Sequence, residues 1–169
     1  MGWITPTGHN DPSSTWSSET YAYDDDTGTH AEETISSSGW GNYLELTHAA
    51  MNCDKVQVYH SYQASIDIVE IDVYYSSAWH NIYSSSCTTG SFVEYAIGST
   101  QSVTAMRIRY HTTKNNRWVG VNEADFNEAG VSPGWNKLAY TSEPPTPNAW
   151  NQLKQTGSSG WVRIDYEGE

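Results

Sequence analysis

Hydrophobic and polar residues alternate along much of the chain between about residue 43 and residue 126. Val56, Val58 and His60 would share one face of an extended segment, and Arg107 and Arg109 would point outward from another. A period of two is that of a β-strand with one buried face. The alternation predicts strands at 43–47, 55–60, 66–75, 79–83, 92–97, 103–110 and 118–126. Because no helical period accompanies them, we expect an all-β fold, an antiparallel sandwich or barrel.

Breaks in the alternation indicate where these strands bend or turn. The phase changes inside residues 66–75, and an extra residue would produce such a change, so we expect a β-bulge near Val69-Glu70. Ser76-Ser77 separates two strand-like runs and predicts a hairpin. Residues 1–20, rich in Pro, Gly, Ser and Thr, predict an irregular lead-in.

After Gly130 a short motif occurs twice. Residues 135–143 and 161–169 share the order Trp, any residue, a base, Leu or Ile, any residue, Tyr, two residues and Glu. The number of matched positions favours a repeat over coincidence, although two copies are too few for a self-supporting solenoid. We therefore predict a sandwich in residues 1–130 and a small Trp- and Tyr-rich β appendage in residues 131–169. The appendage would dock on the main domain, on a second copy or on subunits of a particle.

Composition and charge narrow the possible partners. Charged residues make up 17% of the chain, and its 8 Trp and 12 Tyr outnumber 2 Phe, which favours half-exposed rings with a polar group. The net charge is −12 and the eight basic residues are dispersed, so nucleic acid and anionic membrane are poor partners. No apolar run approaches the length of a membrane span.

The start of the chain bears on location and on cysteine chemistry. The residues up to Pro6 are too few and too polar for a signal peptide, which leaves the location open. An extracellular or virion-surface place, reached by another route, is our expectation. Cys53 and Cys87 match no metal motif and could form a disulfide or remain two small buried thiols. The missing secretion signal favours free thiols.

Residues 21–30 carry the densest chemistry, with Asp24, Asp25 and Asp26 in a row. Adjacent carboxylates repel one another unless water or a cation screens them, and Ca2+ prefers such oxygens in flexible loops. Alone, the segment is best explained as a solvated turn, because Asp and Gly favour turns. A metal site would need another acid from a distant part of the chain.

No arrangement typical of a catalytic site is evident. Glu70, Asp72 and Glu94 alternate with apolar residues, so a solvated sheet face explains them. The sequence has no Gly-x-Ser-x-Gly elbow, Gly-rich phosphate loop or paired zinc histidines, and its six His are scattered singly. We therefore predict that the protein is not an enzyme.

The order of these segments resembles the galactose-binding-like jelly roll, the discoidin or F5/8 type C group, which includes carbohydrate-binding modules. The resemblance covers about residues 10–128. It rests on the Asp loop with Thr29, Gly39-Trp-Gly-Asn-Tyr-Leu-Glu-Leu, Lys55-Val-Gln-Val, Ile71-Asp-Val-Tyr-Tyr with Trp79-His, Ala105-Met-Arg-Ile-Arg-Tyr and Val121-Asn-Glu-Ala-Asp-Phe. It implies a sandwich of two antiparallel sheets.

The resemblance also implies a structural Ca2+ between an early acidic loop and a Glu near the last strand. The positions that match this pattern are Asp24, Asp26, Thr29 and Glu123, with the carbonyl of Tyr21 as a further ligand. Asp25 stands where the family often has Gly, which adds charge but gives up an easy left-handed backbone.

Ligand sites in this group lie on loops at one end of the sandwich or on a sheet face, where aromatic rings meet sugars. The candidates for ligand binding are Trp40, Tyr62, Trp79, His80, Asn116, Arg117 and Trp118. Most of the eight Trp must be structural, and packing is the favoured role for Trp40 and Trp79. Trp118, beside the turn at 114–117, is the strongest candidate for exposure.

The sequence therefore predicts a non-catalytic binding module for carbohydrate or a surface polymer. The alternative is a structural or assembly protein of a virus or phage particle, a tail or capsid-surface component without sugar binding. Few charges, many Ser, Thr and aromatic residues and a repeated tail favour the alternative. The two hypotheses are compatible, because an adhesion domain on a particle would satisfy both.

Overall fold

A computed structural model describes residues 2–86 and 88–130 of the chain, and these residues are almost wholly antiparallel β-structure. The strands are β1 (Trp3–Ile4), β2 (Gly8–Asn10), β3 (Ala31–Ile35), β4 (Gly39–Trp40), β5 (Leu44–Tyr62), β6 (Ile66–Tyr75), β7 (Ala78–Ser85), β8 (Phe92–Thr112) and β9 (Arg117–Glu128), with a 3-10 helix η1 (Glu19–Ala22). No helix within these residues could cross a membrane. The predicted appendage and its repeat lie outside the described residues.

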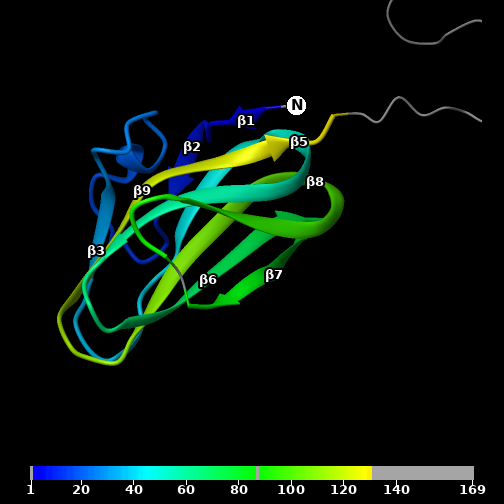
Figure 1. Ribbon diagram of the computed structural model, residues 1–169. Helices are drawn as coiled ribbons and strands as arrows, with labels where there is room; N and C mark the ends of the chain where they lie inside the picture. Colours follow the sequence, from blue (N-terminus) through cyan, green and yellow to red (C-terminus); the bar gives the residue numbers. More distant parts are fainter. Residues whose placement is uncertain (1, 87, 131–169) are drawn as a thin grey trace, which may run out of the picture. The chain divides into compact units, whose positions relative to one another are not determined.

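Two long strands, β5 and β8, belong to both layers of the sandwich (Figure 1). Residues 44–47 of β5 pair with residues 105–108 of β8, which continues to β6 and then to β7. We call this the β6 layer. Residues 55–59 of β5 pair with residues 92–96 of β8, and β9 lies along the other edge of β5, with β3 and β1 beside it. We call this the β9 layer.

The continuity of β5 and β8 differs from the separate strands that the alternation predicted. The register of β5 against β8 shifts between Thr47 and Met51 and again between Cys53 and Lys55. Such irregularities bend a strand and increase its twist, so one strand can pass from one layer to the other. The alternation is interrupted there, which is why the sequence indicated two strands.

The hairpin between β6 and β7 confirms the prediction from Ser76-Ser77. Both serines have positive φ, 50° and 63°, as a type I′ turn requires. The register of β6 shifts between Ile66 and Ile68 against β8, and between Ile71 and Asp72 against β7. Val69 and Glu70 themselves pair regularly with both neighbouring strands, so the position predicted for the bulge was wrong. The lead-in is also more regular than predicted, because it contributes β1 and β2.

The inward faces of the two layers form the core, and the imidazole of His60 lies within it. Val56 and Val58 are fully buried, as their alternation predicts, and so is His60. The His60 ring lies with Nδ1 2.7 Å from the Tyr110 hydroxyl and Nε2 2.7 Å from the Tyr95 hydroxyl. Burial lowers the pKa of His60 to about 3, so the ring is neutral at physiological pH.

Cys53 is also fully buried and is a free thiol. Its Sγ donates to the carbonyl of Lys55 at 3.1 Å, and burial raises the pKa of the thiol to about 11. A protonated, inaccessible thiol is a poor nucleophile. Cys87 lies outside the described residues.

Candidate functional site

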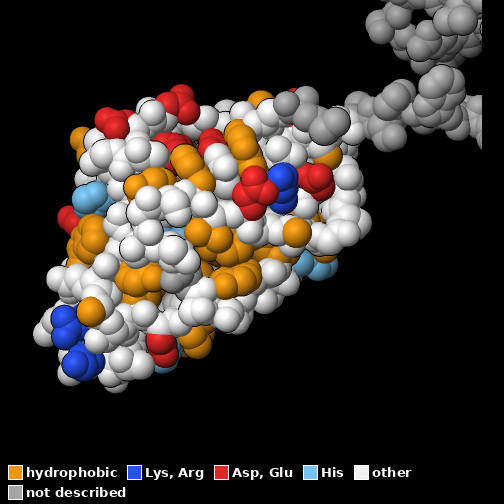
Figure 2. Space-filling model, in the orientation of Figure 1, with side chains coloured by type: hydrophobic (Ala, Val, Ile, Leu, Met, Phe, Trp, Pro, Cys, Tyr) orange, Lys and Arg blue, Asp and Glu red, His pale blue; other side chains and the backbone are white. Residues whose placement is uncertain are grey.

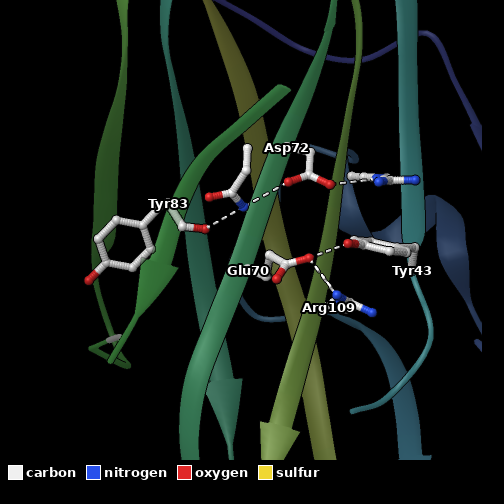
Figure 3. A network of polar contacts seen from close by, with 7 residues as sticks. Tyr43, Glu70, Asp72, Tyr83 and Arg109 are labelled. Carbon is white, nitrogen blue, oxygen red and sulfur yellow. Dashed lines mark hydrogen bonds and ion pairs between the residues drawn. The ribbon is translucent and has the colours of Figure 1, made fainter. Parts of the chain in front are cut away.

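The outer face of the β6 layer carries two ion pairs between neighbouring strands. Arg107 and Arg109 point outward from β8 because Met106 and Ile108, which alternate with them along the strand, are buried. In the strand register, Arg107 lies opposite Asp72 of β6, and Arg109 lies opposite Glu70. The Arg107 Nε to Asp72 Oδ2 and Arg109 Nη2 to Glu70 Oε1 distances are both 2.7 Å (Figure 3). Glu70 and Asp72, which the sequence suggested were part of a solvated sheet face, are therefore paired with arginines.

Three aromatic rings stack with these two guanidinium groups. The ring of Tyr43 lies between them, with its centroid 3.9 Å from Cζ of Arg107 and 4.4 Å from Cζ of Arg109. Trp79 stacks on Arg107 at 4.5 Å, and Trp40 stacks on Arg109 at 4.4 Å. We call this row, in the order Trp79, Arg107, Tyr43, Arg109 and Trp40, the arginine ladder. Each contact is within the range of a cation–π interaction.

Hydrogen bonds beneath the arginine ladder fix its geometry. Glu70 Oε1 accepts hydrogen bonds from the Tyr43 hydroxyl and from Nε of Arg109 (Figure 3). Asp72 Oδ1 accepts from the amide of Asn81 at 2.8 Å, while its other oxygen accepts from Arg107. Burial, followed by the bond to Glu70, raises the pKa of Tyr43 far above its usual range, so its hydroxyl remains a donor.

The rings and guanidinium groups lie nearer the solvent than the acids do. Trp40 is 39% exposed, and the two arginine side chains are about a quarter exposed, whereas the Asp72 side chain is 5% exposed. A guanidinium has five N–H donors, and the ion pairs occupy only some of them. The arrangement therefore presents aromatic edges and hydrogen-bond donors above compensated carboxylates.

Two of the predicted ligand-binding aromatics, Trp40 and Trp79, lie at opposite ends of the arginine ladder. The next residue, His80, stacks on the Tyr75 ring with centroids 3.8 Å apart, and its Nε2 is 3.2 Å from the Tyr75 carbonyl. Tyr62 packs against the core, with its ring 6.4 Å from that of Tyr110. The structure thus separates His80 and Tyr62 from the face where the two Trp gather.

Trp118 was predicted to be the most exposed Trp of the candidates, and the structure shows that Trp40 is more exposed. The Trp118 Nε1 donates a hydrogen bond to Glu32, and its ring lies edge-on to His30 with centroids 4.9 Å apart. The ring also covers Gly120, where an added Cβ would come within 3.1 Å of it. These contacts hold Trp118 against β9 and leave it only half-exposed.

Asn116 and Arg117 lie at the end of the sandwich where three loops meet. The backbone N–H of Asn116 donates to the carbonyl of Ser36 at 3.2 Å, and the side chain of Asn115 accepts from the N–H of Ser38. Nε of Arg117 is buried and has no hydrogen-bond partner among the described residues. Figure 2 shows Lys and Arg side chains at this end. Along the strands, the predicted polar candidates Asn116 and Arg117 are therefore far from the middle of the arginine ladder.

In the acidic loop, the two predicted aspartate ligands are engaged in turn formation. Asp24 accepts a hydrogen bond from the Thr29 hydroxyl at 2.9 Å and one from the N–H of Asp26 at 3.1 Å. Asp26 Oδ1 accepts from the N–H of Gly28 at 2.8 Å. Tyr21 is an exposed side chain beside them. This is the behaviour expected of Asp in a solvated turn.

Glu123, the predicted distant acid, does lie next to this loop. The amide of its neighbour Asn122 donates to the Thr27 carbonyl at 2.9 Å, which joins β9 to the loop. Glu123 is 3% exposed, and both carboxylate oxygens lack a hydrogen-bond partner among the described residues. Burial, and then the charges of Asp125 and Asp25, raise the pKa of Glu123 to about 7. Backbone N–H groups nearby oppose this shift without completing a hydrogen bond.

Asp25, rather than the predicted ligands Asp24 and Asp26, is the loop carboxylate whose charge acts on Glu123. Its φ is +62°, the left-handed conformation that the Gly of the family pattern would adopt easily. Thr5 Oγ1 donates to Asp25 Oδ1 at 3.1 Å and lies 3.5 Å from Asp125 Oδ1. Thr5 thereby links the loop to β9.

The described residues contain no group of three or more His, Cys, Asp or Glu side chains arranged to hold a metal ion. The unpartnered carboxylate of Glu123 nevertheless suits a hard cation, which would be completed by oxygen ligands from the acidic loop. Glu123 and the loop would hold Ca2+ in a structural role. The metal remains a prediction.

The fold and the faces described above can be compared with solved structures. A family 32 carbohydrate-binding module of AlyQ, in complex with 4,5-unsaturated mannuronic acid, is 14% identical with a TM-score of 0.57; the match covers 76% of this chain and 100% of that module. The chain has the galactose-binding-like fold. The predicted β-sandwich is thereby confirmed.

Two modules from Clostridium perfringens show the same likeness. The family 32 module of NanJ, in complex with galactose, is 9% identical with a TM-score of 0.58, and the match covers 73% of this chain and 96% of that one. The first such module of a family 31 glycoside hydrolase is 12% identical, with a TM-score of 0.57 and the same coverage. No protein-family model and no curated protein sequence matches the chain. These structures give no support to the predicted viral or phage alternative.

Proposed function

We propose that this chain is a non-catalytic carbohydrate-binding module and that the arginine ladder is its ligand face. The carrying observation is the alternation of Trp79, Arg107, Tyr43, Arg109 and Trp40 on one exposed sheet face. Sugars present C–H faces to aromatic rings and hydroxyls to polar groups, and ligand sites combine these features. The modules of similar fold include structures solved with mannuronic acid and galactose, which supports a glycan ligand.

The rigidity of the arginine ladder also favours a binding role. Side chains that are ordered before a ligand arrives lose less conformational entropy when it binds. Glu70 and Asp72 each accept hydrogen bonds from an arginine and from a second residue, so both guanidinium groups are held in position. A binding face assembled from free arginines would have to order them at a cost in affinity.

The same hydrogen bonds argue against glycoside hydrolysis on this face. A glycosidase usually needs one carboxyl group to protonate the leaving oxygen and a second to act as base or nucleophile. Here both carboxylates are committed to arginine, at 2.7 Å in each ion pair. Neither is free to deliver a proton, so the face is suited to binding rather than to cleavage.

A structural Ca2+ belongs to this proposal as a brace for the fold. Ionised Glu123 lies beside Asp25 and Asp125, and the three charges disfavour one another. A divalent cation held by Glu123 and the acidic loop would offset this repulsion and join the loop to β9. The ion would act away from the arginine ladder and would supply no chemistry.

A glycan array followed by calorimetry tests the proposed function. Wild-type protein should bind at least one glycan, and Trp40→Ala should weaken that binding at least about ten-fold, because it removes an exposed ring of the arginine ladder. Phe92→Ala is the matched control, since Phe92 is 41% exposed, close to the 39% of Trp40, and lies on β8 where it pairs with the β9 layer. The control should bind as wild type does. Absence of any glycan binding, or equal binding by the two variants, would contradict the proposal.

A further inference from the structure

We propose that the arginine ladder binds an extended, uncharged glycan chain lengthwise, along the row from Trp79 to Trp40. This inference rests on the proposed function and adds the class and orientation of the ligand. It is carried by the length of the row, by its charge balance and by the burial of the acids beneath it.

The length of the arginine ladder exceeds the reach of a single sugar. At one end Trp79 pairs with Tyr74, which lies opposite Ala105 of β8, and at the other end Trp40 lies opposite His111. Six residues of antiparallel strand separate these two levels, and the contact distances within the row allow the Trp79 and Trp40 ring centroids to lie up to about 17 Å apart. A terminal sugar would contact one ring and its neighbour, whereas a chain of several sugars could contact the whole row.

The charge balance of the row favours an uncharged ligand. Its two guanidinium groups face two carboxylates at 2.7 Å, so the four groups carry no net charge. The whole chain has a net charge of −12, which repels a polyanion at long range. A uronate that captured Arg107 would also leave Asp72, with a side chain 5% exposed, as an unpaired buried charge.

Neutral sugars avoid this conflict because they need only the remaining donors. Each guanidinium can keep its ion pair and still donate N–H bonds to hydroxyl or ring oxygens. The edges of the Tyr43 ring between the two arginines and of the Trp rings beyond them would meet the C–H groups of successive sugars. The repeating order of ring and donor therefore matches the repeating order of apolar and polar groups along a glycan.

Calorimetry with paired ligands tests the inference. The probes are glucose, galactose, mannose and xylose, their unbranched hexamers, and hexamers of glucuronic, galacturonic and mannuronic acid. We expect at least one neutral hexamer to bind at least about ten-fold tighter than its monomer and tighter than every uronate hexamer. Raising the salt concentration should leave the dissociation constant of this hexamer unchanged, because no net charge is neutralised.

Variants at both ends of the row distinguish a chain from a single sugar. Trp40→Ala and Trp79→Ala should each reduce the advantage of hexamer over monomer, whereas Phe92→Ala should preserve it, with thermal unfolding recorded for all three proteins. Equal affinity for monomer and hexamer, or tighter binding of a uronate hexamer, would overturn the inference and leave the proposed function standing. Failure of every probe and of the glycan array would overturn both.

Discussion

Replacing Glu123 by Gln should stabilise the metal-free protein at neutral pH, although the substitution removes a residue from the inside of the fold. Glu123 is 3% exposed, its carboxylate oxygens have no hydrogen-bond partner among the described residues, and its pKa is raised from 4.5 to about 7. The amide of Gln has nearly the same shape and carries no charge. The variant therefore removes an unfavourable ionisation without opening a cavity.

The size of the effect follows from the shift in pKa. Each unit corresponds to about 1.4 kcal/mol, and the shift from 4.5 to about 7 gives an upper value of about 3 kcal/mol. Water near the exposed acidic loop screens part of this energy, so we expect Glu123→Gln to raise the free energy of unfolding by about 2 kcal/mol at pH 7.5.

The pH dependence has a definite sign. The folded protein binds the proton of Glu123 more tightly than the unfolded chain does. The stability that this proton gives to wild-type protein is complete below about pH 4.5 and is lost as the pH rises through about 7. Wild-type protein in a chelator should thus lose stability across this interval. In Glu123→Gln the slope should become smaller, and Asp125, whose pKa burial also raises, should account for part of what remains.

Urea unfolding with chelator, and again with Ca2+, provides the assay. Ca2+ should stabilise wild-type protein and leave Glu123→Gln unchanged, because the variant lacks the carboxylate that would bind the ion. Glu128→Gln is the matched control, since Glu128 lies on the same strand and is exposed. The reasoning is refuted if Glu123→Gln is the less stable protein in chelator at pH 7.5. Stabilisation by Ca2+ that survives in the variant would refute the assigned ligand.

Three further predictions concern packing and hydrogen bonds. Tyr43→Phe keeps the ring between the arginines but removes the bond to Glu70, and urea unfolding should show a loss of about 1 kcal/mol; an unchanged midpoint would contradict this. Gly120→Ala places a Cβ 3.1 Å from the Trp118 ring, so it should destabilise the protein by about 1–3 kcal/mol and change the Trp fluorescence; an unaltered spectrum would show that the ring is not held there. The His60 ring should show no NMR titration between about pH 4.5 and 8, because burial lowers its pKa to about 3; a midpoint near 6 would contradict its burial.

The alternation of hydrophobic and polar residues predicted which residues face the core better than it predicted where strands end. Val56, Val58 and His60 are buried together, as expected. Their strand, β5, continues through residues 48–54, where the alternation is interrupted and shifts in register carry the strand between layers. Alternation reports burial on one face, and a strand that changes layers changes the face it buries. Continuity through such a bend depends on pairing with β8, a long-range property that a local pattern does not contain.

The arginine ladder was only partly predictable for the same reason. Outward positions for Arg107 and Arg109 follow from the sequence, as do outward positions for Glu70 and Asp72, although the structure covers these acids rather than leaving them solvated. Their pairing depends on the register of β6 against β8, which brings each acid opposite its arginine. Tyr43 was missed because it precedes β5 and joins the row through tertiary contacts. One signal could have indicated the pairs. Two arginines lie two positions apart on one strand, and two acids have the same spacing on a nearby strand.

The proximity of Glu123 to the acidic loop was predicted through family resemblance, since the two segments are far apart in the chain. The structure shows that Asp25 and Thr27 make this approach, whereas Asp24 and Asp26 stabilise the turn itself. Spacing in the sequence identified the segment correctly. All three adjacent aspartates are exposed, and Asp25, whose backbone is left-handed, is the one whose charge acts on Glu123.

Calorimetric titration of glycan into wild-type protein, Trp40→Ala and Phe92→Ala tests the central claim most directly. The arginine ladder as ligand face predicts that wild-type protein and Phe92→Ala bind with equal affinity, and that Trp40→Ala binds at least about ten-fold more weakly while unfolding at the same temperature. Full affinity in Trp40→Ala, or no heat of binding from any glycan in wild-type protein, would contradict it.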